Sequence, residues 1–152
     1  MRGLSLSLFV MLAGVTTASA DPGTLERTNA FDQAYAASFY QFDACGDGIA
    51  GRIYRNALTE KLKQCPFSAD ARKRFLSRSA AQRRKSSQIM AKMIEDNGGL
   101  PNRLQGMTRT CHQQADSAEY RAVRSRLNDF SAGQAGPDTV VPQACDAAEI
   151  AP

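Results

Sequence analysis

The residues whose chemistry stands out are four cysteines and a single histidine. The chain has an even number of cysteines with no close pair of the C-x-x-C kind, and its one histidine, His112, directly follows a cysteine. Metal sites built from cysteine and histidine use close spacings, so we expect no metal here. Widely spaced cysteines in even number instead predict two disulfides, if the chain reaches an oxidising compartment. The cysteines are Cys45, Cys65, Cys111 and Cys145.

The N-terminus predicts that the chain does reach such a compartment. Arg2 precedes the short apolar run LSLSLFVMLAGV, and the small residues after it end in Ala20. This order is typical of a cleavable secretory signal, which makes Asp21 the first mature residue. The run is shorter than the roughly 18 to 20 residues of a membrane span, and no later stretch approaches that length. We therefore expect a protein exported to the periplasm or the cell exterior, with no membrane span after signal cleavage; an uncleaved anchor is the alternative.

Two short motifs resemble known sites. The segment Thr108–His112 resembles the haem-attachment motif C-x-x-C-H with threonine in place of its first cysteine, which removes half of the covalent attachment. The segment Phe42–Gly48 resembles the calcium loop of secreted phospholipases A2, a family in which a His-Asp pair follows soon after. Here the first histidine is His112, and its neighbour is Gln113. Both likenesses stop short of the residues that do the chemistry, so we expect no cofactor.

Catalysis has few candidates. Asp43, Asp47 and Glu60 offer paired carboxylates, but the sequence does not fix their separation, on which glycoside hydrolysis depends. His112 has no serine in a G-x-S-x-G setting to activate. We therefore expect a binding protein and name no catalytic residue, with an unrecognised small enzyme as one alternative.

Helical periodicity accounts for most of the chain. Apolar residues recur at helical spacing over residues 25–42, and the same stripe continues to residue 62. Gly46, Gly48 and Gly51 interrupt it, because each glycine weakens a helix interior by about 1 kcal/mol relative to alanine. We expect a kink near Gly46 to Gly48, with Asp47 as the N-cap of a helix that restarts there. The same glycines are candidates for close contact with a ligand or a neighbouring element.

Capping and stop signals predict three further helices, at residues 69–96, 101–111 and 117–130. The apolar face of the first of them is thin in its middle, where only small and polar residues occur. The sequence thus predicts an all-α fold, a small bundle of about four helices tied by two disulfides, with an irregular C-terminal tail. The expected divisions are a signal peptide at 1–20, a single disulfide-bonded helical domain at 21–146 and a loose tail at 147–152.

Helix lengths predict how the cysteines pair. A helical run from Cys45 to Cys65 separates them by roughly 30 Å at about 1.5 Å per residue. Disulfide Cα atoms lie only about 4.4 to 6.8 Å apart, so these two do not bond to each other. The long helix at 69–96 returns past the level of Cys45, and the later helices bring Cys111 to that level and Cys145 toward Cys65. We predict the pairs Cys45–Cys111 and Cys65–Cys145.

The net charge of +4 is mildly basic, and the excess is concentrated in residues 69–96. Arg74, Arg78, Lys85 and Lys92 are separated by 4, 7 and 7 residues, which places them on one stripe of a helix. Such a stripe suits an anionic partner, although a solvated helix face gives the same pattern. Nucleic acid is not expected, because the protein is exported and its basic residues are not interleaved with aromatics.

These features predict an exported, non-enzymatic protein that binds an envelope component or a protein partner through the basic stripe and the surface of the three glycines. The first alternative is a secreted effector or inhibitor acting outside the producing cell, and the second is the unrecognised small enzyme.

Overall fold

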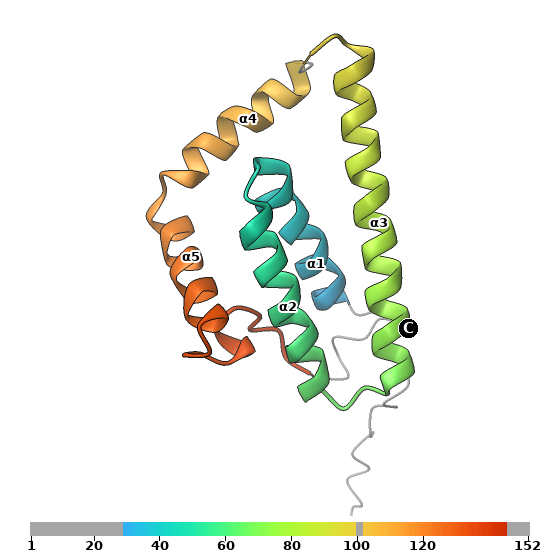
Figure 1. Ribbon diagram of the computed structural model, residues 1–152, viewed down its shortest axis with the longest axis vertical. Helices are drawn as coiled ribbons and strands as arrows, with labels where there is room; N and C mark the ends of the chain where they lie inside the picture. The colour runs from blue at the N-terminus through green and yellow to red at the C-terminus, as the bar shows by residue number, and fades with distance from the viewer. Residues whose placement is uncertain (1–28, 100–101, 146–152) are drawn as a thin grey trace, which may run out of the picture.

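The chain folds into α-helices, as Figure 1 shows for the computed structural model, which describes residues 29–99 and 102–145. No strand occurs in these ranges, so the all-α prediction is confirmed. The expected signal peptide and the expected loose tail lie outside the described residues. The helices are α1 (Asn29–Gln41), α2 (Gly48–Gln64), α3 (Ala69–Asp96), α4 (Asn102–Ala115) and α5 (Ala118–Ser131), with short 3-10 helices η2 (Asp43–Cys45) and η3 (Pro137–Thr139).

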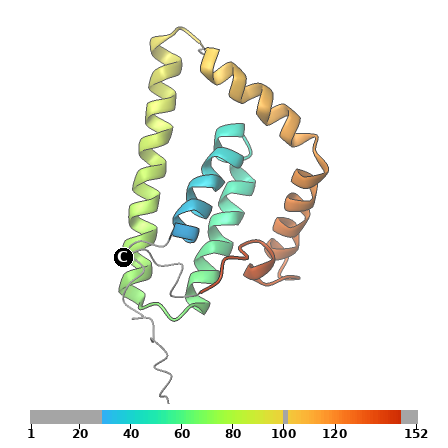
Figure 2. The same ribbon diagram turned by 180° about the vertical axis from the view of Figure 1, so that it is seen from behind.

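The expected kink at the glycines is a full reversal of the chain. Gly46 has φ of 83°, in the left-handed region that favours glycine, and it ends η2. Asp47 then caps α2, because its side chain accepts a hydrogen bond from the backbone N–H of Ala50 at 3.1 Å. As a result α1 and α2 pack side by side as an antiparallel hairpin (Figures 1 and 2) and do not form one long bent helix.

The third helix begins and ends where its capping residues predict. The side chain of Ser68 accepts a hydrogen bond from the backbone N–H of Ala71 at 3.1 Å, and Gly98 with φ of 62° follows the last turn. With 28 residues α3 is about 42 Å long, whereas α1 has 13 residues and is about 20 Å long. The second half of α3 therefore extends past the tip of the α1–α2 hairpin, and α4 meets it above that tip (Figure 1).

The main core lies at the end of the hairpin away from this tip. Phe31 of α1, Leu58 of α2 and Phe75 of α3 are fully buried there, and Val141 of the C-terminal segment packs against them. Lys61, only 8% exposed, forms an ion pair with Asp138 of η3. The segment after α5 is irregular in structure but packs against the core up to Cys145.

The two disulfides lie at opposite ends of α2. Cys45, just before α2, pairs with Cys111 of α4 at a Cα–Cα distance of 5.3 Å, and Cys65, just after α2, pairs with Cys145 at 5.2 Å. These are the two pairs that the helix lengths predict. The first fastens α4 to the tip of the hairpin, and the second fastens the C-terminal segment to its base.

Candidate functional site

The turn between α1 and α2 holds two of the carboxylates that the sequence offers for catalysis. An Asp43 carboxylate oxygen accepts a hydrogen bond from Arg55 of α2 at 2.6 Å and lies 3.8 Å from Arg83 of α3. The side chains of Asp43 and Arg55 are 15% and 19% exposed, so this ion pair is well shielded from water. Asp43 therefore ties α3 to the hairpin.

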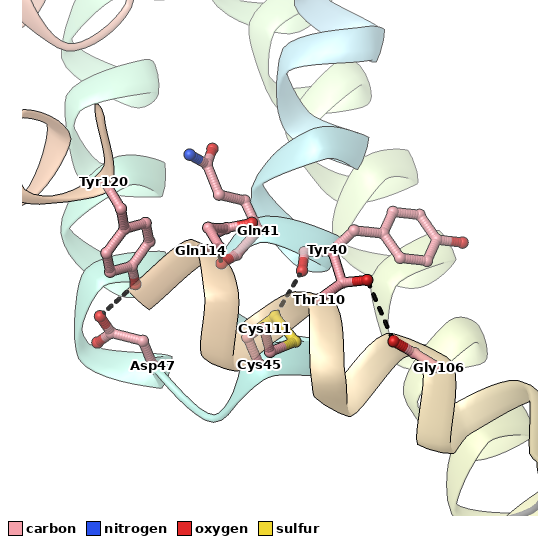
Figure 3. Close-up of a disulfide and its surroundings, with 9 residues drawn as sticks. All are labelled: Tyr40, Gln41, Cys45, Asp47, Gly106, Thr110, Cys111, Gln114 and Tyr120. Carbon is pink, nitrogen blue, oxygen red and sulfur yellow. Dashed lines mark hydrogen bonds between the residues drawn. A yellow bond between two sulfur atoms is a disulfide. The ribbon is translucent and has the colours of Figure 1, made fainter. Parts of the chain in front are cut away.

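Asp47 performs the same task for α5. Tyr120 donates its phenolic hydrogen to Asp47 Oδ2 at 2.6 Å (Figure 3), and Arg124 Nε lies 3.4 Å from the same oxygen. Burial raises the pKa of Tyr120 to about 12, and the hydrogen bond to Asp47 and its negative charge act in the same direction. The phenol is thus held in its neutral, hydrogen-donating form.

The helix α4 reaches this turn through its C-terminal half. The Cys45–Cys111 bond lies beside Gln114, whose side-chain amide donates to the carbonyl oxygen of Gln41 at 3.0 Å (Figure 3). The residues 43–47 are therefore connected to α3 by an ion pair, to α4 by a disulfide and to α5 by a hydrogen bond.

The three glycines near the turn have different reasons to be glycine. A Cβ on Gly51 would lie 2.6 Å from Asp43 Oδ1 and 2.9 Å from Arg55 Nη1, so only glycine admits this ion pair without a shift. Gly46 needs its positive φ, and a Cβ on Gly48 would meet no atom within 4 Å. The close contact predicted for these glycines occurs at Gly51, and its partner is the protein's own ion pair.

The remaining candidates for catalysis are dispersed. Glu60 forms an ion pair with Lys63 at 2.7 Å. His112 is exposed and lines a hollow beside the Cys45–Cys111 bond, and no carboxylate lines that hollow. Within residues 29–99 and 102–145, no group of three or more His, Cys, Asp or Glu side chains could hold a metal ion. In the same part of the chain no helix is both long and apolar enough to cross a membrane.

A groove between α1 and α3, which continues to α4, is a distinctive surface feature of the described residues, and we call it the α1–α3 groove. One half has no charged lining residue and a volume of about 420 Å³, and we call it the apolar half. The other half contains the charged side chains of the groove and has a volume of about 350 Å³, and we call it the polar half. The halves share Phe39, Tyr40 and Ser86, so they are continuous. The apolar half is further lined by Ile89, Met90, Met93 and Met107, and the polar half by Asp32, Tyr35, Ala36, Arg78, Ser79, Gln82 and Arg83.

Methionine is concentrated in the apolar half of this groove. After residue 20 the chain contains methionine only at positions 90, 93 and 107, and all three line the groove. Two further lining residues, Tyr40 and Ile89, are 59% and 53% exposed. Methionine is flexible and polarisable, and it is over-used at surfaces that adapt to their partners.

The polar half carries a cation from the basic stripe. Arg78 Nη2 lies 3.5 Å from Asp32 Oδ1, and both side chains are more than 40% exposed, so this ion pair is weak. The Arg78 guanidinium also lies 5.7 Å from the centre of the Phe75 ring. Arg83 lines the groove as well, and it also forms the ion pair with Asp43 described above.

The two lysines of the basic stripe, Lys85 and Lys92, lie along one edge of the groove, which we call its rim. Ser86 and Met93 line the groove, and each directly follows a stripe residue, Lys85 or Lys92. Consecutive residues of a helix are rotated by about 100° about its axis, so the two lysines lie at the edge of the face of α3 that lines the groove. Lys92 pairs with Asp96 at 3.1 Å, whereas Lys85 has no ion-pair partner among the described residues. Arg74, the fourth stripe residue, is exposed one turn before Arg78.

The sequence predicts that the four basic residues lie on one stripe of α3, but it does not predict the groove beside them. The thin apolar face of residues 69–96 suggested close packing of small side chains, and Ser79 is indeed buried. Beyond Ser79, however, α3 leaves the core, and its apolar residues line an open surface. The restriction of methionine after residue 20 to positions 90, 93 and 107 was the available signal.

No protein-family model, no curated protein and no solved structure matches this chain.

Proposed function

We propose that this chain is an exported, non-enzymatic binding protein that holds a protein partner in the α1–α3 groove. The observation that carries this proposal is the gathering of three methionines and the exposed side chains of Tyr40 and Ile89 in one groove. A contiguous apolar surface on a small protein commonly marks an interaction site. The basic rim beside it makes a partner with negative charge the better fit.

The fastened carboxylates support binding over catalysis. Asp43 and Asp47 are each engaged with cationic or hydroxyl groups of neighbouring helices, which suits a structural role. A general acid or base needs a side chain that can reach a substrate proton, and these two are turned to their own protein.

The N-terminal signal pattern and the two disulfides support export. A periplasmic envelope protein and a secreted effector or inhibitor share these features and differ in where the protein accumulates. Fractionation of the producing cells separates them: we expect retention with the envelope fraction, and recovery from the culture medium would favour the secreted role.

Two isoleucines provide a matched test of the proposed site. Ile89 lines the groove and is 53% exposed, whereas Ile49, on the first turn of α2, is similarly exposed at 59% and does not line it. Tagged wild type, I89E and I49E would be used to recover partners from an envelope extract. We expect one protein recovered with wild type and I49E and lost with I89E. Recovery of the same proteins by I89E, or of none by wild type, would contradict the proposal.

A further inference from the structure

We infer that the occupant of the α1–α3 groove is an amphipathic α-helix of the partner, with acidic residues along one flank of its apolar face. This inference rests on the proposed function and specifies the chemistry of its partner.

The groove has the length of a short helix. Along α3 its lining residues extend from Arg78 to Met93, which is about 22 Å at about 1.5 Å per residue. A helix of about 15 residues, or four turns, covers that distance. Its apolar side chains at helical spacing would lie against Phe39 and Tyr40 of α1 and the methionines of α3, with Met107 of α4 at the far end.

The open shape favours a helix over a lipid chain or another small apolar ligand. Small ligands are held in sites that bury about 70 to 90% or more of their surface. The groove is instead a surface feature in which Tyr40 and Ile89 stay more than half exposed. An amphipathic helix needs only one face covered, because its polar face remains in water, and recognition in a groove is a common way to bind one.

The charges along the rim fix which flank of that helix should be acidic. Arg78, Lys85 and Lys92 repeat every seven residues, which is close to two helical turns. A helix lying along α3 can place glutamates or aspartates with the same repeat opposite them. Exposed ion pairs contribute little energy each, so their main effect is on selectivity and orientation.

Synthetic peptides of about 16 residues test the inference without knowledge of the natural partner. One panel carries leucines at i, i+3, i+4 and i+7 with glutamates along one flank, and a second panel has lysines in place of those glutamates. Binding to the disulfide-intact protein is measured by fluorescence anisotropy. We expect the glutamate peptides to bind about tenfold more tightly than the lysine peptides.

Matched variants locate the two interactions. I89E should weaken the glutamate peptides about tenfold or more, since it introduces a charge into the apolar contact, and I49E should not change their affinity. R78E should reduce the preference for glutamate over lysine peptides, because it reverses one of the three charges along the rim. R84E is the matched control, because Arg84 is an exposed arginine of the same helix that does not line the groove. Far-UV circular dichroism verifies that each variant is folded.

The outcomes separate this inference from the proposed function. If no peptide binds while a natural partner still depends on Ile89, the inference that the occupant is a helix is wrong and the proposed binding function stands. Ile89-dependent binding of dodecanoate in place of the peptides would instead assign the groove to an acyl ligand. Equal affinity for glutamate and lysine peptides would overturn the acidic flank. A natural partner indifferent to I89E would overturn the proposed function itself.

Discussion

Replacing Gly51 by alanine should destabilise the protein even though alanine is the better helix former. The added Cβ would lie 2.6 Å from Asp43 Oδ1 and 2.9 Å from Arg55 Nη1, so the ion pair of these two residues must shift. That shift loosens the contact between the turn and Arg83 of α3 as well.

The two opposing effects differ in size. Forcing an extra carbon into a packed site costs about 1 to 3 kcal/mol, and weakening a shielded, charge-assisted hydrogen bond costs about 1.5 to 3 kcal/mol when it is lost completely. If the site relaxes so that each effect is only partly felt, the two together cost about 2 to 3 kcal/mol. The gain in helix propensity from glycine to alanine is about 1 kcal/mol. We therefore expect G51A to lower the free energy of unfolding by about 1 to 2 kcal/mol.

Urea unfolding of G51A and G106A measures this difference with the same substitution at two sites. Gly106 lies inside α4, and a Cβ there meets no atom within 4 Å, so G106A should stabilise the protein by up to about 1 kcal/mol. In a D43A background the nearest obstructing atom is gone and the flexible Arg55 side chain is released from its ion pair and can move aside, so G51A should become stabilising. Equal stability of G51A and G106A in the wild-type background would refute the close approach at Gly51.

The other predictions concern the disulfides and the turn. Removing either disulfide by paired alanine substitutions should lower the free energy of unfolding by about 2 to 4 kcal/mol. Only C45A/C111A should also weaken peptide binding, because that bond holds α4 at the groove. An equal loss of binding in C65A/C145A would contradict this. Tyr120 should ionise near pH 12 in a spectroscopic titration. Since its pKa is raised on folding, its contribution to stability is full below pH 10 and is lost as the pH rises toward 12. Ionisation of Tyr120 near pH 10 in the folded protein would contradict its burial and its contact with Asp47.

Local signals in the sequence were sufficient for the helices. Ser68 and Asn97 mark the ends of α3 because capping depends on residues adjacent in the chain, and the bounds 69–96 are those of the structure. The rise of a helix also excludes a Cys45–Cys65 bond on local grounds, whereas the choice between the two remaining pairings depends on how far the later helices run back along the first.

The hairpin and the groove depend on contacts between distant segments. The apolar stripe of residues 25–62 is equally compatible with a bent helix and with a hairpin, and the left-handed conformation of Gly46 decides between them. Likewise, Ile89 and Met93 lie at spacings that suit a buried helix. They are left at an open surface because α1 is too short to cover the second half of α3, a length difference that matters only after the helices are aligned.

Methionine methyl resonances test the central claim, that the α1–α3 groove is the binding site, most directly. In the chain from Asp21 onward the only methionines are Met90, Met93 and Met107, so every ¹³C-methyl methionine signal reports on the groove. Titration with the glutamate-flanked peptide should shift all three signals, and I89E should raise the peptide concentration needed for the same shifts about tenfold or more. Peptide binding that leaves the three signals unchanged would place the binding site elsewhere and contradict this account.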